Sequence, residues 1–64
     1  MKTKLNQVQI DFLTDQPETG MGYQKVNIVM SDDNTIDNVT VLNSEYLETD
    51  ENIDINEITH ITLV

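Results

Sequence analysis

The chain has 64 residues, no cysteine and a formal net charge of −9. A chain of this length forms one small domain (1–64) with a small core, and without cysteine no disulfide bond can reinforce it. No window approaches the roughly 20 apolar residues of a membrane helix, and three lysines against twelve acids exclude the basic stripe of proteins that bind DNA or RNA directly. We therefore expect a cytoplasmic protein without membrane contact.

The first half of the chain predicts two strands separated by a long loop. Val8, Ile10 and Phe12 alternate with polar residues, which is the period-two pattern of a half-buried strand. The same alternation runs over residues 25–30 and predicts a second strand. The only proline and both glycines lie in Thr14–Gly22, which is therefore predicted to be a long, mobile loop.

The middle of the chain predicts two strands and two turns. Ser31–Asn34 has the short polar side chains of a turn. A third strand follows over Ile36–Val41, with a bulge expected at Asp37–Asn38 because the apolar spacing there is three instead of two. Asn43–Ser44 can close a tight turn into a short fourth strand, Glu45–Glu48.

The last part predicts one helical turn and a fifth strand. Asp54–Glu57 has the spacing of a capping box, and His60–Val64 alternates again. The expected fold is all-β, a small antiparallel meander of about five strands with one helical turn before the last strand. Its strand spacing resembles that of small SH3-like barrels, which implies a closed barrel or a strongly bent sheet. The predicted core comprises Val8, Ile10, Phe12, Val26, Ile28, Val39, Val41, Ile58, Ile61 and Leu63.

No residue pattern indicates catalysis, a metal or a cofactor. His60 is predicted on the strand face opposite the core, and no nucleophile stands beside it in the sequence. Asp50–Asp54 begins with the oxygen spacing of a calcium loop, but Ile55 occupies the glycine position and Ile61 that of the bidentate glutamate. The sequence therefore predicts a solvated acidic loop and a non-enzymatic protein, with no catalytic, metal or cofactor residues.

Charge and exposed apolar residues are the main functional signals. Residues 31–64 hold nine acids and no lysine or arginine, whereas the charges of residues 1–30 sum to zero. Such a one-sided field favours a basic protein surface. A contiguous exposed apolar group would mark an interface, and the apolar residues opposite the predicted core face are Leu13, Val29, Leu42, Tyr46 and Val64. The predicted partner-binding residues combine both signals: Glu45, Glu48, Asp50, Glu51, Asp54, Glu57, Tyr46, Tyr23 and Met21.

Two functions fit these residues. The first is a small acidic interaction module or accessory protein that docks on a basic protein partner or self-associates as a homodimer through its apolar last strand. The alternative is an inhibitor that mimics nucleic acid, with carboxylates spaced about 6.8 Å apart along a strand. Acids aligned on one face favour the mimic, whereas an apolar patch rimmed by acids favours an ordinary protein interface.

Overall fold

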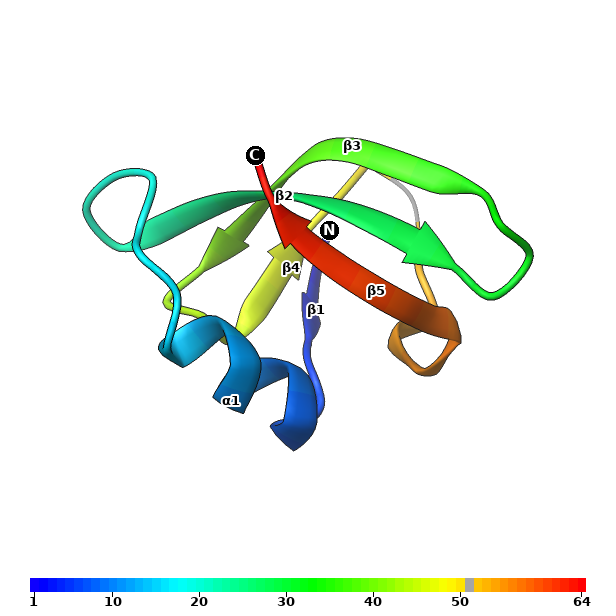
Figure 1. Cartoon of the computed structure of the whole chain (residues 1–64), viewed down its shortest axis with the longest axis horizontal. Helices are drawn as coiled ribbons and strands as arrows, with labels where there is room; N and C mark the ends of the chain where they lie inside the picture. The colour runs from blue at the N-terminus through cyan, green and yellow to red at the C-terminus, as the bar shows by residue number, and fades with distance from the viewer. Residues whose placement is uncertain (51) are drawn as a thin grey trace.

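The computed structural model describes residues 1–50 and 52–64, which form one antiparallel sheet with the strand order β1-β4-β3-β2-β5 (Figure 1). The elements in chain order are β1 (Lys2–Lys4), α1 (Gln7–Thr14), β2 (Tyr23–Met30), β3 (Thr35–Leu42), β4 (Tyr46–Glu48), the 3-10 turn η1 (Ile55–Glu57) and β5 (Ile58–Leu63). The predicted all-β class is confirmed, as are the meander of β2, β3 and β4 and the helical turn before the last strand. The strands β1 and β5 occupy opposite edges, and no pairing among the described residues joins them, so the SH3-like barrel stays a prediction.

The strand predicted around Val8–Phe12 is wrong, because this segment forms helix α1. A capping box starts the helix: the Gln9 N–H donates to Asn6 Oδ1 over 2.9 Å, and the Asn6 N–H donates to Gln9 Oε1 over 3.0 Å. On a helix, residues four apart share a face. Val8 and Phe12 therefore lie together, and they are 79% and 44% exposed instead of buried, whereas Leu13 is fully buried.

The predicted bulge and tight turns are confirmed. Val26 lies opposite Val39 and Ile28 opposite Ile36, so β3 carries one extra residue at this point. Asn38 has a φ of 57°, and its N–H donates to Asn27 Oδ1 over 3.0 Å. Left-handed residues also form the hairpin between β3 and β4, where Asn43 and Ser44 have φ of 53° and 59°, as a type I′ turn requires.

The core lies between α1 and the inner face of the sheet, which curls toward the helix (Figure 1). Of the ten predicted core residues, Val8 and Phe12 are exposed. Four are buried as predicted, namely Val26, Ile28, Val39 and Val41, and four are partly buried against the core, namely Ile10, Ile58, Ile61 and Leu63. Four buried apolar residues were not predicted: Leu5, Leu13, Leu47 and Ile53.

The buried side chain of Gln24 links the loop after α1 to the sheet. Gln24 is 1% exposed, and its Nε2 donates to the carbonyls of Leu13 over 3.0 Å and Gln16 over 3.3 Å. The Lys25 N–H donates to Thr19 Oγ1 over 2.8 Å. The segment predicted as a mobile loop is thus anchored on β2 by several hydrogen bonds.

Removing the cap of α1 should weaken the fold. Asn6→Ala eliminates the acceptor for the Gln9 N–H, and loss of an N-cap typically lowers the free energy of unfolding by about 1 kcal/mol. Urea unfolding followed by circular dichroism measures the change. Asn6→Ser is the control and should keep most of the stability; equal losses in the two variants would contradict a capping role for Asn6.

Candidate interaction surface

The sheet separates the lysines from the face that α1 covers. Leu47 and Val41 are buried on the inner face, so their neighbours along β4 and β3 point outward. Lys2 and Lys4 lie opposite Glu48 and Tyr46 and share that outer face. Lys25 joins them, since its Nζ donates to Thr40 Oγ1 over 2.6 Å on the adjacent strand. All three lysines of the chain therefore stand on the side of the sheet away from α1.

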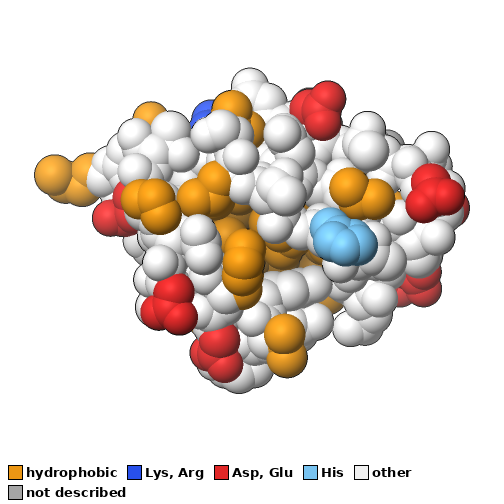
Figure 2. Space-filling view, viewed as in Figure 1, with side chains coloured by type: hydrophobic (Ala, Val, Ile, Leu, Met, Phe, Trp, Pro, Cys, Tyr) orange, Lys and Arg blue, Asp and Glu red, His pale blue; other side chains and the backbone are white. Residues whose placement is uncertain are grey.

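An apolar groove of about 380 Å³ lies between α1 and β5. Figure 2 shows it as a hollow with hydrophobic atoms in its floor and walls, beside the histidine side chain. The described residues that line it are Asn6, Val8, Gln9, Phe12, Ile58, Thr59, His60 and Ile61. We name this set the α1–β5 groove.

A hydrogen bond across the fold holds the walls of the α1–β5 groove in place. Gln9 Nε2 donates to the carbonyl of Ile55 over 2.9 Å and so ties the first turn of α1 to η1. Leu13 anchors the other end of the helix in the core. Val8 and Phe12 project from the remaining side of α1, which leaves an exposed apolar wall.

Acids stand on the elements next to the α1–β5 groove, although none is among the described residues that line it. Asp11 and Asp15 stand on and just after α1, and Asp54 and Glu57 stand at the two ends of η1. Figure 2 shows Asp and Glu side chains around the margin of this face, with little lysine in view. The groove is thus apolar at its centre and negative at its rim.

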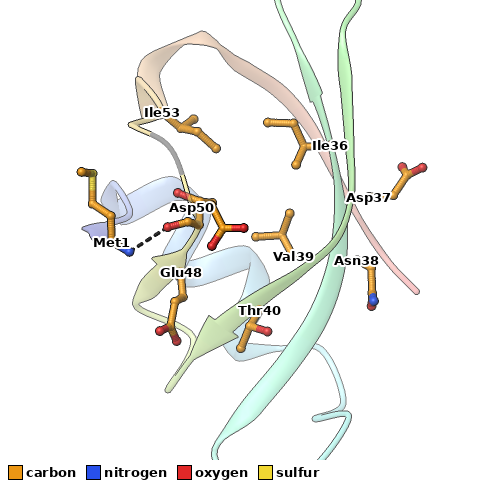
Figure 3. A pocket seen from close by; sticks show the side chains of 10 residues that line it. Met1, Ile36, Asp37, Asn38, Val39, Thr40, Glu48, Asp50 and Ile53 are labelled. Carbon is orange, nitrogen blue, oxygen red and sulfur yellow. Dashed lines mark hydrogen bonds between the residues drawn. The ribbon is translucent and has the colours of Figure 1, made fainter.

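A second cavity, of about 660 Å³, lies beside β3 and the segment after β4 (Figure 3). Asp37, Glu48 and Asp50 line it together with the partly buried Ile36 and the buried Val39 and Ile53. The N-terminal amino group donates to the carbonyl of Thr49 over 2.7 Å at its edge. No group of three or more His, Asp or Glu side chains placed to hold a metal ion occurs among residues 1–50 and 52–64.

The structure does not bring the predicted partner-binding acids into one row. Glu45 belongs to the hairpin turn, Glu48 ends β4 and Asp50 lines the second cavity. Two acids have structural roles: Asp54 Oδ1 accepts from the Asn56 N–H over 3.0 Å to cap η1, and Glu57 accepts a hydrogen bond from the Ser31 hydroxyl. Glu51 lies outside the described residues.

The predicted aromatic residues lie on the outer face of the sheet. Tyr23 and Tyr46 both lie opposite Leu42, from the strands on either side of it, so the three side chains form a row next to Lys4. Met21, at 99% exposure, stands alone in the loop before β2. Leu13, also expected outside the core, is instead fully buried. Leu13 is therefore absent from the expected patch, whereas Tyr23, Leu42 and Tyr46 come together on the outer face.

Sequence reasoning missed Val8 and Phe12 as surface residues because it placed both in the core. One signal could have corrected this, since Asn6 followed three residues later by Gln9 is a capping-box pattern. With a helix in place, the spacing of four between Val8 and Phe12 predicts a stripe distinct from that of Leu13.

Comparison with protein-family models, with curated proteins and with solved structures finds no match for this chain. No helix within residues 1–50 and 52–64 has the length and apolar character needed to cross a membrane. The assignment of function consequently depends on the surfaces described above.

Neutralising acids beside the second cavity should stabilise the fold at low salt. Asp37 and Asp50 reach the same cavity from different segments of a chain with net charge −9, so their replacement by asparagine relieves repulsion. We expect D37N/D50N to raise the Tm by about 2–4 °C near 10 mM salt. Near 1 M salt the gain should vanish, because the Debye length falls from about 30 Å to about 3 Å.

Thermal melts at the two salt concentrations test this prediction. Lys4→Gln is the control, since it makes the net charge more negative and should lower the Tm at low salt. A destabilised D37N/D50N variant at low salt would show that the two carboxylates stabilise the fold.

Proposed function

We propose that this protein is a non-enzymatic acidic interaction module that docks on a basic protein partner through the α1–β5 groove. One observation carries the proposal: a groove with apolar walls lies open on the side of the sheet opposite the lysines, next to elements that carry carboxylates. An apolar patch with a polar, charged rim is the usual anatomy of a protein interface.

The exposed side chains can contribute useful binding energy. Burying a valine or phenylalanine side chain completely gains about 1.5–3 kcal/mol. Val8, at 79% exposure, is largely available for such burial, and Phe12, at 44%, is partly available. A standard interface covers about 800 Å² on each partner, which is near one fifth of the 4184 Å² surface of this chain.

The lining of the groove supports binding over catalysis. His60 is the one ionisable side chain among the described residues that line it, and its Nδ1 lies 3.3 Å from the hydroxyl of the adjacent Thr59. General acid–base or nucleophilic chemistry needs a second group positioned against the histidine. The groove offers apolar walls and amide side chains instead.

The distribution of acids favours this proposal over the nucleic-acid mimic. A carboxylate track needs acids at alternate positions of one strand, but β4 has three residues and a single acid, Glu48. Asp54 and Glu57 are engaged in the structure of η1 and the adjacent turn. The mimic remains the second candidate, and a partner that is displaced by DNA or RNA would favour it.

Capture from extracts of the source cell, read by quantitative mass spectrometry, tests the proposal. Val8→Ser and Phe12→Ser, alone and combined, should lower recovery of the specific partner at least tenfold, since each removes apolar surface from the groove. Thr62→Ser on the outer face is the matched control and should retain the partner. Circular dichroism melts verify that the variants are folded. If the Phe12 variants do not fold, V8S alone still tests the proposal, because Val8 is the more exposed residue.

The captured partner should have a basic contact surface, and its affinity should fall as salt rises. Equal recovery with wild type and the folded V8S variant would contradict the proposal, as would affinity that is independent of salt.

A further inference from the structure

The free edge of β5 borders the α1–β5 groove. Among the described strands β5 pairs with β2 alone and lies at the end of the sheet. An edge strand presents unpaired backbone N–H and C=O groups, which serve as a template for another extended chain. Ile58 and Ile61 belong both to this strand and to the lining of the groove.

The register identifies which backbone groups are free. The Val64 N–H donates to the carbonyl of Lys25 on β2 over 3.0 Å, and Leu63 lies opposite Val26. In an antiparallel pair, hydrogen-bonded and non-hydrogen-bonded positions alternate. His60, Thr62 and Val64 therefore direct their backbone groups toward β2. Ile61 and Leu63 direct theirs away from β2, toward the open side.

The same two residues have their side chains on the inner face. Ile61 lines the α1–β5 groove, and Leu63 packs partly buried against the core. A residue that pairs with Ile61 from outside places its side chain on the same face. That side chain would lie over the groove, where the exposed apolar surface of Val8 and Phe12 is available.

We infer that the groove and the β5 edge form one site for an extended basic peptide segment, which adds to the sheet as a sixth strand. This inference rests on the proposed function and specifies its partner. Backbone bonds form with Ile61 and Leu63, and apolar side chains at alternate positions of the segment enter the α1–β5 groove. Strand addition to a sheet edge with pockets for alternate side chains is an established recognition mode.

Charge complementarity selects the occupant. The lysines lie on the outer face, whereas Asp11 and Asp15 stand on and just after the helix that borders the groove. Lysine or arginine residues that flank the apolar positions of the segment would meet these carboxylates. A second copy of this chain would instead bring two net charges of −9 together.

Selection from a phage-displayed library of random nine-residue peptides tests the inference. The library is panned on the folded wild-type protein and counter-selected on V8S/F12S. The enriched peptides should carry apolar residues at alternate positions with flanking lysine or arginine. In an amide hydrogen-exchange experiment by NMR, the saturating peptide should slow exchange of the Ile61 and Leu63 amides at least tenfold. The exchange rate of the Thr62 amide, which already pairs with β2, should stay within about twofold of its value in the free protein.

Backbone methylation of the selected peptide supplies a second readout. An N-methyl group on the residues that pair with Ile61 and Leu63 should weaken binding at least tenfold, whereas methylation of the residues between them should change affinity less than threefold. This control alters the ligand alone and leaves the fold of the protein untouched.

Three outcomes would overturn the inference. The first is enrichment of no peptide, or of peptides with helical periodicity. The second is peptide binding in the groove without protection of Ile61 and Leu63; the proposed function then stands with a different docking mode. The third is protection of these amides by raised protein concentration alone, which indicates a homodimer. Failure of the proposed function is recognised separately, by partner capture that does not depend on Val8 and Phe12.

Discussion

Leu13→Ala is expected to leave most of the protein unfolded at 25 °C, whereas Val8→Ala is expected to leave its stability nearly unchanged. Leu13 is fully buried, and replacing a buried leucine by alanine lowers the free energy of unfolding by about 2–5 kcal/mol. A single-core domain of this size rarely has more than about 3–5 kcal/mol. The loss at Leu13 is therefore comparable to the whole stability.

Val8 offers the matched comparison because it lies on the same helix and is 79% exposed. Its replacement removes little buried surface, and alanine favours a helix over valine by a few tenths of a kcal/mol. Urea titration of both variants, followed by circular dichroism, measures the difference. A strand at residues 8–12 with Val8 inward would reverse the order, so a V8A variant less stable than L13A would contradict the position of α1.

Gln24→Glu is expected to unfold the protein at pH 7 and to recover as the pH falls. The carbonyls of Leu13 and Gln16 can only accept hydrogen bonds, so the side-chain amide must direct its NH₂ group at them. A carboxylate of the same shape cannot donate to these carbonyls and faces them with a negative charge. Unpaired buried carbonyls lower the free energy of unfolding by about 1–3 kcal/mol. Burial of an uncompensated charge lowers it by several kcal/mol more.

The sign of the pH dependence follows from the same geometry. The folded state disfavours the charged form at position 24, which raises the pKa of the introduced glutamate above its ordinary value of about 4.3. The folded state of the variant therefore holds a proton more readily than its unfolded state. Its stability is greatest below about pH 4 and is lost as the pH rises through the folded-state pKa.

Urea unfolding of Q24E and wild type between pH 4 and pH 7 checks this expectation. The relevant quantity is the difference between the two proteins at each pH, since the other acids titrate in both. Gln24→Met is the control: it loses the hydrogen bonds without adding a charge. Its difference from wild type in free energy of unfolding should therefore be nearly constant with pH. A constant deficit for Q24E as well would show that position 24 is open to solvent.

Sequence patterning predicted the elements whose side chains alternate on a sheet. Val26, Ile28, Val39 and Val41 obey that alternation and are buried. The bulge at Asn38 was visible as a break in the spacing, and the hairpin at Asn43–Ser44 was visible because these residue types tolerate positive φ. The local sequence was enough to predict each of these features, since the apolar spacing and the turn residues indicate the same structure.

The N-terminal segment could not be predicted by alternation because Val8, Ile10 and Phe12 satisfy it by coincidence on a helix. The capping box of Asn6 and Gln9 stabilises the helix there despite the β-branched residues, and burial of Leu13 in the core stabilises it further. The strand β1 has three residues, which is too short for a period to emerge.

The groove proposed as the contact surface differs from the residues that the sequence indicated. An apolar surface within an acidic molecule was expected, yet the expected Tyr23 and Tyr46 lie on the outer face near lysines. The α1–β5 groove exists because α1 and β5, which are far apart in the sequence, leave apolar walls uncovered between them. Such a surface depends on the tertiary arrangement and has no local sequence signal.

Chemical-shift mapping of the ¹⁵N-labelled protein with its captured partner tests directly whether the α1–β5 groove is the contact surface. We expect the largest shifts at Val8, Phe12, Ile58 and Ile61, with smaller changes at Asp11 and Asp15. Shifts concentrated at Tyr23, Leu42 and Tyr46 on the outer face, with the groove unaffected, would contradict it.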